Sequence, residues 1–279
     1  MPDTIRIGRV EIMPVADQRT KGPVAFLFPS VPADAWAPYR DLLIDDGQNV
    51  PVSVTSFVVR SGGQTILVDT GIGAKGRQLI PDGRLPDALA EAGVRPDDVD
   101  VVFTTHIHID HVGWHTTLRG ESYVPTFPKA RYVFVRSEWE HFTAPDVAHA
   151  AGNEHVVDCV LPLRDAAEVV LVDGEHKLTD DLTLLPAPGH TPSHSCVAIV
   201  SDGEAGMIIG DLAHHPAQLI ETAWSPVFDM DPALAAESRA RIAGRLEEEG
   251  LLVLAGHFPA PNHGRLLRVE GRRSWRSGT

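Results

Sequence analysis

A dense cluster of potential metal ligands lies in the middle of the chain, at residues 106–111. It reads H-x-H-x-D-H, so three imidazoles and one carboxylate fall within six positions. These groups suit zinc and similar divalent ions. An apolar run of strand length leads into the cluster, which predicts ligands at the end of a strand. Side chains two apart in an extended segment point the same way, so His106, His108 and Asp110 should converge. His111 would then turn toward a second ion.

Three further potential ligands follow, each directly after a glycine: His190, Asp211 and His257. A structural zinc site usually has four ligands around one ion, and seven nitrogen and oxygen ligands are enough for two ions. Ligand imidazoles also need hydrogen-bond partners that fix their tautomers. The residues expected to provide them are Asp69, Thr105 and Thr191.

The composition limits the class of protein. The 279 residues include 24 Lys+Arg and 38 Asp+Glu, a formal net charge of −14, which disfavours a nucleic-acid partner. No segment has the ~18 apolar residues of a membrane span, and the N-terminus lacks a signal-peptide pattern. Cys159 and Cys196 lie far apart, and Cys196 lies in an apolar run typical of a buried thiol. We expect one cytoplasmic domain over residues 1–279, with no nucleic-acid or membrane partner.

Short apolar and β-branched runs predict the strands, the first two as a hairpin: residues 52–60, 65–68, 99–104, 131–135, 169–172, 182–185, 196–200, 206–210 and 251–255. Two helices are predicted, one over residues 85–92 and one over residues 232–249. Asp231 should be the N-cap of the longer helix, and Gly250 should end it. The core-facing residues of that helix are predicted to be Leu234, Ala235, Ser238, Ile242, Ala243 and Leu246. Many strands with few helices predict packed sheets with helices outside.

In this order the motifs resemble those of the metallo-β-lactamase superfamily. Besides H-x-H-x-D-H they are Asp69-Thr70-Gly71, Gly189-His190-Thr191, Gly210-Asp211 and Gly256-His257. The resemblance implies an α/β fold, an αββα sandwich of two mixed β-sheets with outer helices. One ion would be held by His106, His108 and His190, and the other by Asp110, His111 and His257. Asp211 would bridge the two ions. A hydroxide held between them would be the nucleophile, and Asp110 would be catalytic by passing a proton to the leaving group.

Within the superfamily, residues 210–215, 228–231 and 256–259 resemble the branch of lactonases and methyl parathion hydrolase-like enzymes. This implies two divalent ions, with zinc expected, and a small ester or lactone as substrate. Phosphotriester hydrolysis would be a promiscuous activity. The common zinc β-lactamases carry cysteine where Asp211 stands, and acyl-homoserine lactonases carry a tyrosine near the position of His214. The alternative is a mononuclear iron oxidoreductase of the same fold, similar to persulfide dioxygenases.

The candidate substrate-binding residues are Trp114, His214, His215, Trp224 and Phe258. For each of them, packing or a plain loop role is the competing interpretation. His194 is expected to form local hydrogen bonds. Four more histidines are expected at the surface: His141, His149, His155 and His176. The predicted partner is a small-molecule substrate, and a homodimer remains an open alternative to a monomer.

Overall fold

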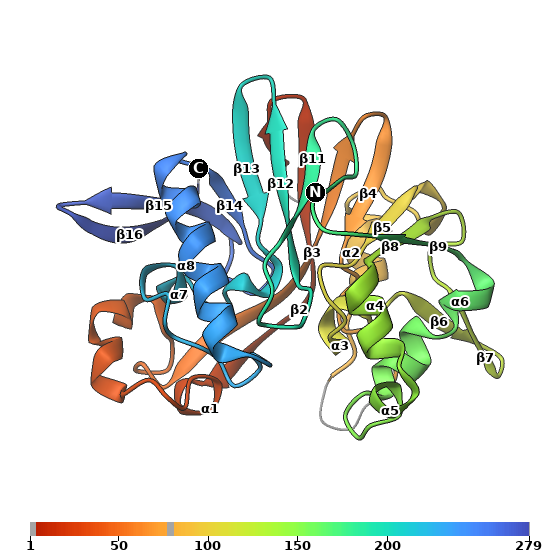
Figure 1. The fold of residues 1–279 in the computed structure, drawn as a ribbon, viewed down its shortest axis with the longest axis horizontal. Coiled ribbons are helices and arrows are strands. Elements are labelled where there is room, and N and C mark those ends of the chain that lie inside the picture. Colours follow the sequence, from red (N-terminus) through yellow and green to blue (C-terminus); the bar gives the residue numbers. More distant parts are fainter. Residues whose placement is uncertain (1–3, 77–80, 279) are drawn as a thin grey trace. The chain divides into compact units, whose positions relative to one another are not determined.

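The computed structural model describes residues 4–76 and 81–278. The chain divides into two compact units (Figure 1). Unit 1 comprises Met1–Gln18, Val54–Leu184 and Val200–Glu204, and unit 2 comprises Arg19–Ser53, Leu185–Ile199 and Ala205–Thr279. Each unit has its own apolar core. No helix in the described ranges is both long enough and apolar enough to span a membrane.

The first sheet is mixed and has the strand order β1-β2-β3-β4-β5-β8-β9. Its strands are β1 (Ile5–Ile7), β2 (Val10–Pro23), β3 (Asn49–Ser61), β4 (Gln64–Val68), β5 (Val101–Phe103), β8 (Arg131–Val135) and β9 (Glu168–Val172). The predicted β3–β4 hairpin is confirmed, and Gly62 and Gly63, with φ of 59° and 76°, form its turn. From β4 to β9 the strands run parallel, so they end at the same edge.

Short helices surround the strands of unit 1. They are α2 (Leu85–Glu91), η2 (Pro96–Asp98), α3 (Ile109–Val112), α4 (Arg136–Thr143), α5 (Pro145–Ala148), η3 (Val156–Val160) and α6 (Leu163–Ala166). The small hairpin of β6 (Thr116–Arg119) and β7 (Ser122–Pro125) lies next to α6 and η3. Helix α4 packs on β8 and β9, and its Trp139 and Phe142 join Phe134 and Tyr132 in the core.

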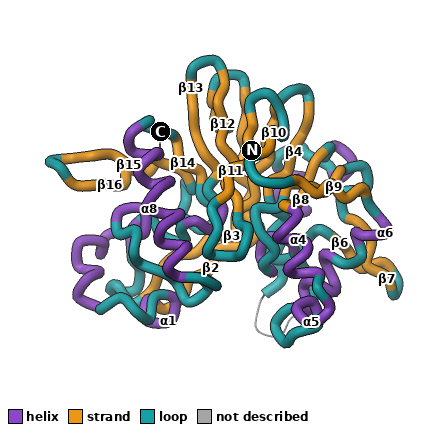
Figure 2. The backbone as a smooth tube through the Cα atoms, in the orientation of Figure 1, coloured by secondary structure: helices purple, strands orange, loops and turns teal. Residues whose placement is uncertain are grey.

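The second sheet has the order β10-β11-β12-β13-β14-β15-β16. Its strands are β10 (His176–Lys177), β11 (Leu182–Pro186), β12 (Ser195–Ser201), β13 (Glu204–Ile208), β14 (Leu252–Leu254), β15 (His263–Val269) and β16 (Arg272–Ser277). Strands β13 and β14 are parallel, whereas β14, β15 and β16 are antiparallel neighbours. Figure 2 shows β15 and β16 as a long hairpin in unit 2, with helix α8 (Pro232–Glu248) close to it.

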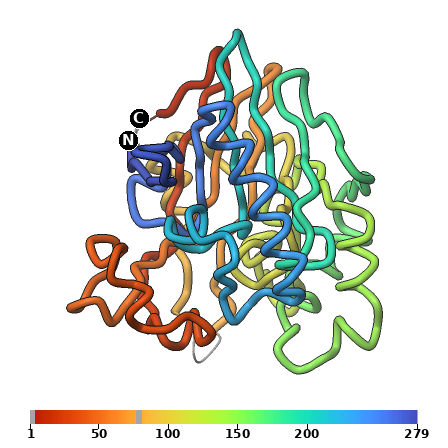
Figure 3. The backbone as a smooth tube through the Cα atoms, turned by 60° about the vertical axis from the view of Figure 1, so that its left-hand side comes forward, coloured from red at the N-terminus to blue at the C-terminus, as the bar shows by residue number. Residues whose placement is uncertain are grey.

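Residues 24–48 form a cluster of short helices within unit 2, drawn in orange in Figure 3. It contains α1 (Val24–Leu27) and η1 (Ala33–Leu42). Phe28 and Trp36 are buried there against Ala217 of α7 (Ala217–Ile220). The apolar side chains of this stretch thus pack against a distant segment of the chain rather than along one amphipathic helix.

The longer predicted helix is confirmed as α8. The Asp231 side chain accepts a hydrogen bond from Leu234 N, and Gly250 follows the helix with φ of 61°. Its buried face differs from the prediction at two positions. Leu234 is 37% exposed, and Arg239 is fully buried on the face expected to be apolar.

Candidate metal centre

Asp69 holds residues 105–111 of unit 1 in place through hydrogen bonds. Strands β4 and β5 pair in parallel with Val68 opposite Phe103, so the residues just after them lie side by side. Asp69 adopts a φ of 60°, and its Oδ1 accepts a hydrogen bond from Thr105 N at 2.8 Å. Its Oδ2 accepts from Thr105 Oγ1 and from His111 Nδ1, both at 2.8 Å. One carboxylate therefore fixes both ends of the H-x-H-x-D-H motif.

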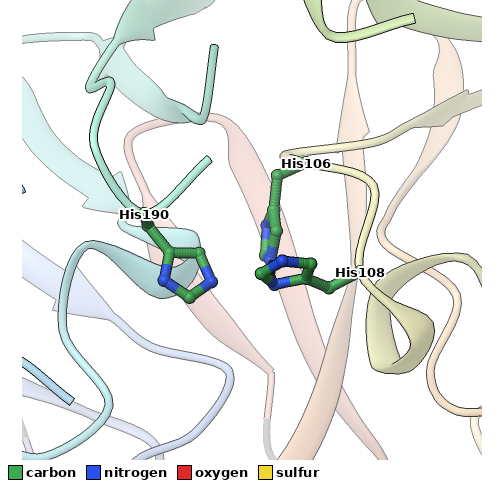
Figure 4. A group of neighbouring side chains, drawn as sticks. All are labelled: His106, His108 and His190. Atoms are coloured by element: carbon green, nitrogen blue, oxygen red, sulfur yellow. Dashed lines mark hydrogen bonds between the residues drawn. The ribbon is translucent and has the colours of Figure 1, made fainter. Parts of the chain in front are cut away.

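His106 and His108 converge as the alternating pattern predicted. The two rings lie edge to face, and His106 Nε2 is 3.1 Å from His108 Nδ1 (Figure 4). Since the hydroxyl proton of Thr105 is donated to Asp69, Thr105 Oγ1 accepts a hydrogen bond from His106 Nδ1 at 3.0 Å. That contact fixes the tautomer in which the lone pair of His106 is on Nε2.

The extended conformation ends after His108, which differs from the prediction. Residues 109–112 form the helical turn α3, so Asp110 does not continue the alternation of His106 and His108. Asp110 instead lies on the same turn as His111, with its Oδ1 3.8 Å from His111 Nε2. His111 is buried, whereas the Asp110 side chain is 24% exposed. The turn places the His111 ring next to that of His106, with 4.0 Å between the ring centroids.

Two buried side chains hold the peptide between His106 and His108. Glu138 Oε1 accepts a hydrogen bond from Ile107 N at 3.0 Å, and His155 Nε2 donates to Ile107 O at 3.3 Å. The prediction that His155 lies at the surface is wrong, because its exposure is 3%. His155 follows the polar residues Asn153 and Glu154, and its partner lies on a loop 48 residues earlier in the chain, so no local pattern indicated this contact.

In unit 2, His190 lies on the loop between β11 and β12. Gly189 has a φ of 126°, and a Cβ there would lie 2.1 Å from Ala235 N, so the loop backbone packs directly against the start of α8. His194 closes the base of the loop through Ala187 O, and its Nε2 accepts a hydrogen bond from Asp211 N at 2.9 Å. The contact with Ala187 O, seven residues away, agrees with the predicted local hydrogen bonding of His194, whereas the bond from Asp211 N, 17 residues away, was not predicted.

Asp211 and His257 meet because of strand register. Ile208 of β13 pairs with Leu254 of β14, and Asp211 and His257 each lie three residues beyond their strands. His257 Nε2 is 3.1 Å from Asp211 Oδ1, and His190 Nε2 is 3.3 Å from Asp211 Oδ2. His257 Nδ1 donates to Ser53 O at 2.7 Å, so Nε2 is the nitrogen that faces Asp211.

A buried carboxylate that the sequence did not assign supports His190. Asp229 Oδ1 is 2.9 Å from His190 Nδ1, and Asp229 Oδ2 accepts from Arg239 Nη2 at 3.0 Å. Burial lowers the pKa of His190, but its hydrogen bonds to Asp211 and Asp229 outweigh that effect and raise the pKa. The sequence contained one indication that Arg239 has a special role, namely that it lies on the face of the predicted helix that is otherwise apolar. Thr191, predicted as a support, is buried, and its Oγ1 has no hydrogen-bond partner among the described residues.

The five substrate-binding candidates lie in different environments. Trp114 is half-buried, and its Nε1 donates to the buried carboxylate of Asp17 at 3.0 Å. It also lines a cavity of about 720 Å³ in unit 1, together with Arg95 and Arg119. His214 lies in unit 2 with its Nε2 3.0 Å from Asp211 Oδ2 and its ring stacked on that of His257. His190, Asp211 and His214 form a group whose ligand atoms lie within 4.8 Å of one another.

The other three candidates make packing contacts. His215 is fully buried against Trp36, and burial lowers its pKa to about 4. Trp224 stacks on Trp36 at 4.7 Å between ring centroids. Phe258 is 1% exposed and packs edge-on against Trp275. These contacts agree with the packing interpretation, and a role in substrate binding stays a prediction.

Comparison with known proteins identifies the family. Residues 49–257 match the metallo-β-lactamase superfamily. The chain belongs to this superfamily. N-acyl homoserine lactonase AiiA from Bacillus thuringiensis subsp. kurstaki is 22% identical over 228 residues, which cover 76% of this metallo-β-lactamase-like chain and 83% of the relative.

Solved structures agree on the superfamily fold. AidC, described as a dizinc quorum-quenching lactonase, has a TM-score of 0.81 at 21% identity, covering 99% of this chain and 97% of its own. The hydrolase AbOPH has a TM-score of 0.82 at 23% identity, covering 98% and 95%. The predicted α/β metallo-β-lactamase fold is therefore confirmed.

Proposed function

We propose that this metal-dependent hydrolase of the metallo-β-lactamase superfamily is dinuclear and opens a small, neutral lactone or ester. His106, His108 and His190 would hold one ion, Asp110, His111 and His257 the other, and Asp211 would bridge them. The observation that carries the proposal is the hydrogen bonding of the imidazoles. His106, His111, His190 and His257 each have Nδ1 engaged by an oxygen, so Nε2 is the nitrogen that would bind an ion.

The donor set fits divalent ions in both units. Neutral imidazoles whose second nitrogen is held by a carboxylate, hydroxyl or carbonyl oxygen are typical metal ligands. The oxygens here are Thr105 Oγ1, Asp69 Oδ2, Asp229 Oδ1 and Ser53 O. Each oxygen of the Asp211 carboxylate lies within 3.3 Å of an imidazole nitrogen. This arrangement suits a carboxylate that would offer one oxygen to each of two ions. Zinc is the metal expected for such nitrogen and oxygen ligands.

The side chains divide the chemistry among them. When bound, a pair of ions lowers the pKa of a shared water toward ~7 and offsets the negative charge that develops on the substrate oxygen. Asp110 is the partly exposed carboxylate of the group, and it would take up a proton at Oδ and deliver it to the leaving oxygen. Asp69 and Asp229 are buried and hydrogen-bonded to ligands, so they orient imidazoles rather than touch substrate.

The relatives support the lactone or ester class. AiiA is named as an N-acyl homoserine lactonase and AidC as a dizinc quorum-quenching lactonase. At the position after the bridging aspartate where acyl-homoserine lactonases carry tyrosine, this chain has His214. His214 Nδ1 is buried and has no hydrogen-bond partner among residues 4–76 and 81–278. We propose that His214 replaces the tyrosine in contacting the substrate.

Metal analysis and turnover test the proposal together. The purified protein should contain two divalent ions per chain and hydrolyse members of a panel of lactones, aryl esters and phosphotriesters. A chelator should abolish turnover, and added zinc should restore it. Asp211→Ala and His106→Ala should lose at least 100-fold in kcat/KM, whereas His149→Ala, at an exposed histidine, should match the parent. His214→Ala should raise KM more than it lowers kcat.

Two results would overturn this function. One iron per chain with oxygen consumption on a persulfide substrate would favour the mononuclear oxidoreductase. Full metal content without hydrolysis of any lactone or ester would exclude the substrate class. Phosphotriester turnover is expected to be slower than lactone turnover. The cytoplasmic location and the single domain over residues 1–279 belong to the same proposal, and the homodimer stays a prediction.

A further inference from the structure

Arg239 is a fully buried cation in the middle of α8. Its exposure is 0%, and it shares the buried helix face with Ala235, Ile242 and Ala243. Moving a guanidinium out of water is costly unless its N–H groups find acceptors and its charge a partner. A buried arginine on an apolar helix face therefore indicates a role that needs its charge or its hydrogen-bond donors, which an apolar residue such as leucine lacks.

The guanidinium holds the segment that follows Asp211. Arg239 Nε donates to Leu212 O at 2.7 Å, and Nη1 donates to Thr222 O at 3.0 Å and Trp224 O at 2.8 Å. All three acceptors are backbone carbonyls from a stretch with little regular structure. The Arg239 side chain thereby gives these carbonyl groups the hydrogen bonds that a neighbouring strand would give them in a sheet.

The fourth contact leads to a proposed metal ligand. Arg239 Nη2 donates to Asp229 Oδ2 at 3.0 Å, and Asp229 Oδ1 accepts from His190 Nδ1 at 2.9 Å. The three side chains form a buried series in which each is at most 2% exposed. The backbone reinforces it, because Met230 N donates to His190 O at 3.1 Å.

We propose that Asp229 and Arg239 are positioning residues of the metal centre: Asp229 holds the His190 ring with Nε2 as the ligand atom, and Arg239 holds Asp229. This rests on the proposed function, in which His190 is a ligand. The carboxylate accepts the Nδ1–H, so one tautomer and one ring orientation are selected. Arg239 keeps both the carboxylate and the Leu212 carbonyl, next to Asp211, in fixed positions. Helix α8 thus sets the geometry of two ligands without touching an ion.

Cobalt or zinc affinity tests the proposal directly. The variants are Asp229→Asn, Asp229→Ala and Arg239→Lys, each measured by competition with a chromophoric chelator. Outer partners of ligand histidines typically change metal affinity 10- to 100-fold. Asp229→Ala should weaken binding of the ion that His190 holds by about that factor, and Asp229→Asn and Arg239→Lys by less. The visible spectrum of the Co²⁺ form should shift in band position or intensity, since the orientation of a ligand ring changes.

Two controls separate positioning from general destabilisation. Arg245→Met removes an exposed ion pair with Glu249 on the same helix and should leave affinity and spectrum unchanged. Ile242→Val loosens the core packing of α8 without touching the series, and should lower stability but not affinity. Should Asp229→Ala fail to fold, the near-isosteric Asp229→Asn decides the matter.

Failure of the inference is distinguishable from failure of the proposed function. If His190→Ala loses metal while both Asp229 variants bind cobalt like the parent with an unchanged spectrum, the positioning role is refuted and the metal centre stands. If His190→Ala binds two ions with parental affinity, the ligand assignment itself is refuted. A shift that Ile242→Val reproduces would reduce the effect to helix stability and overturn the proposal.

Discussion

His115 gives the chain an acid sensitivity that can be worked out from its surroundings. The imidazole is fully buried beside the rings of Tyr132 and Phe134. Its Nδ1 is 2.6 Å from Thr70 Oγ1, and its Nε2 is 2.8 Å from Thr104 Oγ1. Burial, with a smaller contribution from nearby Lys75 and His111, lowers the pKa of His115 to about 3. In the folded protein, His115 is therefore neutral at any pH above about 3.

The sign and size of the effect follow from linkage. An unfolded histidine has a pKa near ~6.5, so between that pH and about 3 the unfolded chain binds one more proton than the folded chain. The contribution of His115 to the free energy of unfolding is fully present above ~pH 6.5. Below that pH it falls by up to ~1.4 kcal/mol per pH unit. Between pH 7.5 and 5.0 this one group should cost about 2 kcal/mol.

Urea unfolding of the chelator-treated protein at the two pH values measures the cost. His115→Gln keeps hydrogen-bonding groups but does not titrate in this range, so its loss of stability from pH 7.5 to 5.0 should be about 2 kcal/mol smaller than that of the parent. Other histidines, including the buried His215, titrate in both proteins and cancel in the difference. If the two proteins lose the same stability within ~0.5 kcal/mol, His115 accepts a proton in the folded state and the reasoning is refuted.

Three other outcomes follow from single buried groups. Asp17→Ala should destabilise the protein by about 3 kcal/mol in urea unfolding, because Ile72 N, Leu85 N and Trp114 Nε1 lose their acceptor; a change below ~1 kcal/mol would contradict this. Gly189→Ala should lower metal content and kcat/KM by at least 10-fold, since its Cβ would lie 2.1 Å from Ala235 N; retained activity would show that the loop can shift. Cys159 and Cys196 should not react with a thiol reagent in the native protein and should both react in urea, because both are buried and burial raises the pKa of Cys196 to about 12; a fast native reaction would refute this.

Elements with strong local signals were predictable. The apolar run before His106, the Gly62-Gly63 hairpin and the capped helix α8 depend on neighbours in sequence, and the structure has all three. Strands β15 and β16 were missed because they are rich in arginine. The backbones of the two strands pair with each other. Only alternate residues of β15 are buried, so only those positions need to be apolar. A half-exposed hairpin of this kind gives no continuous apolar run.

The candidate ligands stood out in the sequence for a similar reason. His106, His108, Asp110 and His111 are adjacent in sequence, and His190, Asp211 and His257 each follow a glycine at a strand end, so local patterns marked them. Their supports were not predictable in the same way. Asp229, Glu138 and His155 act on residues 31 to 48 positions away, and such contacts leave no periodic signal.

The amino-acid sequence by itself determined which side chains are able to bind a cation, because residue type alone decides ligand chemistry. Only the tertiary structure decided which nitrogen of each imidazole remains for an ion. That choice depends on where an acceptor lies in space, and the acceptors Asp69, Asp229 and Ser53 reach their histidines through strand register and helix packing. Arg239 shows the same division, since its charge was visible in the sequence, and its burial became evident only when α8 packed over the segment after Asp211.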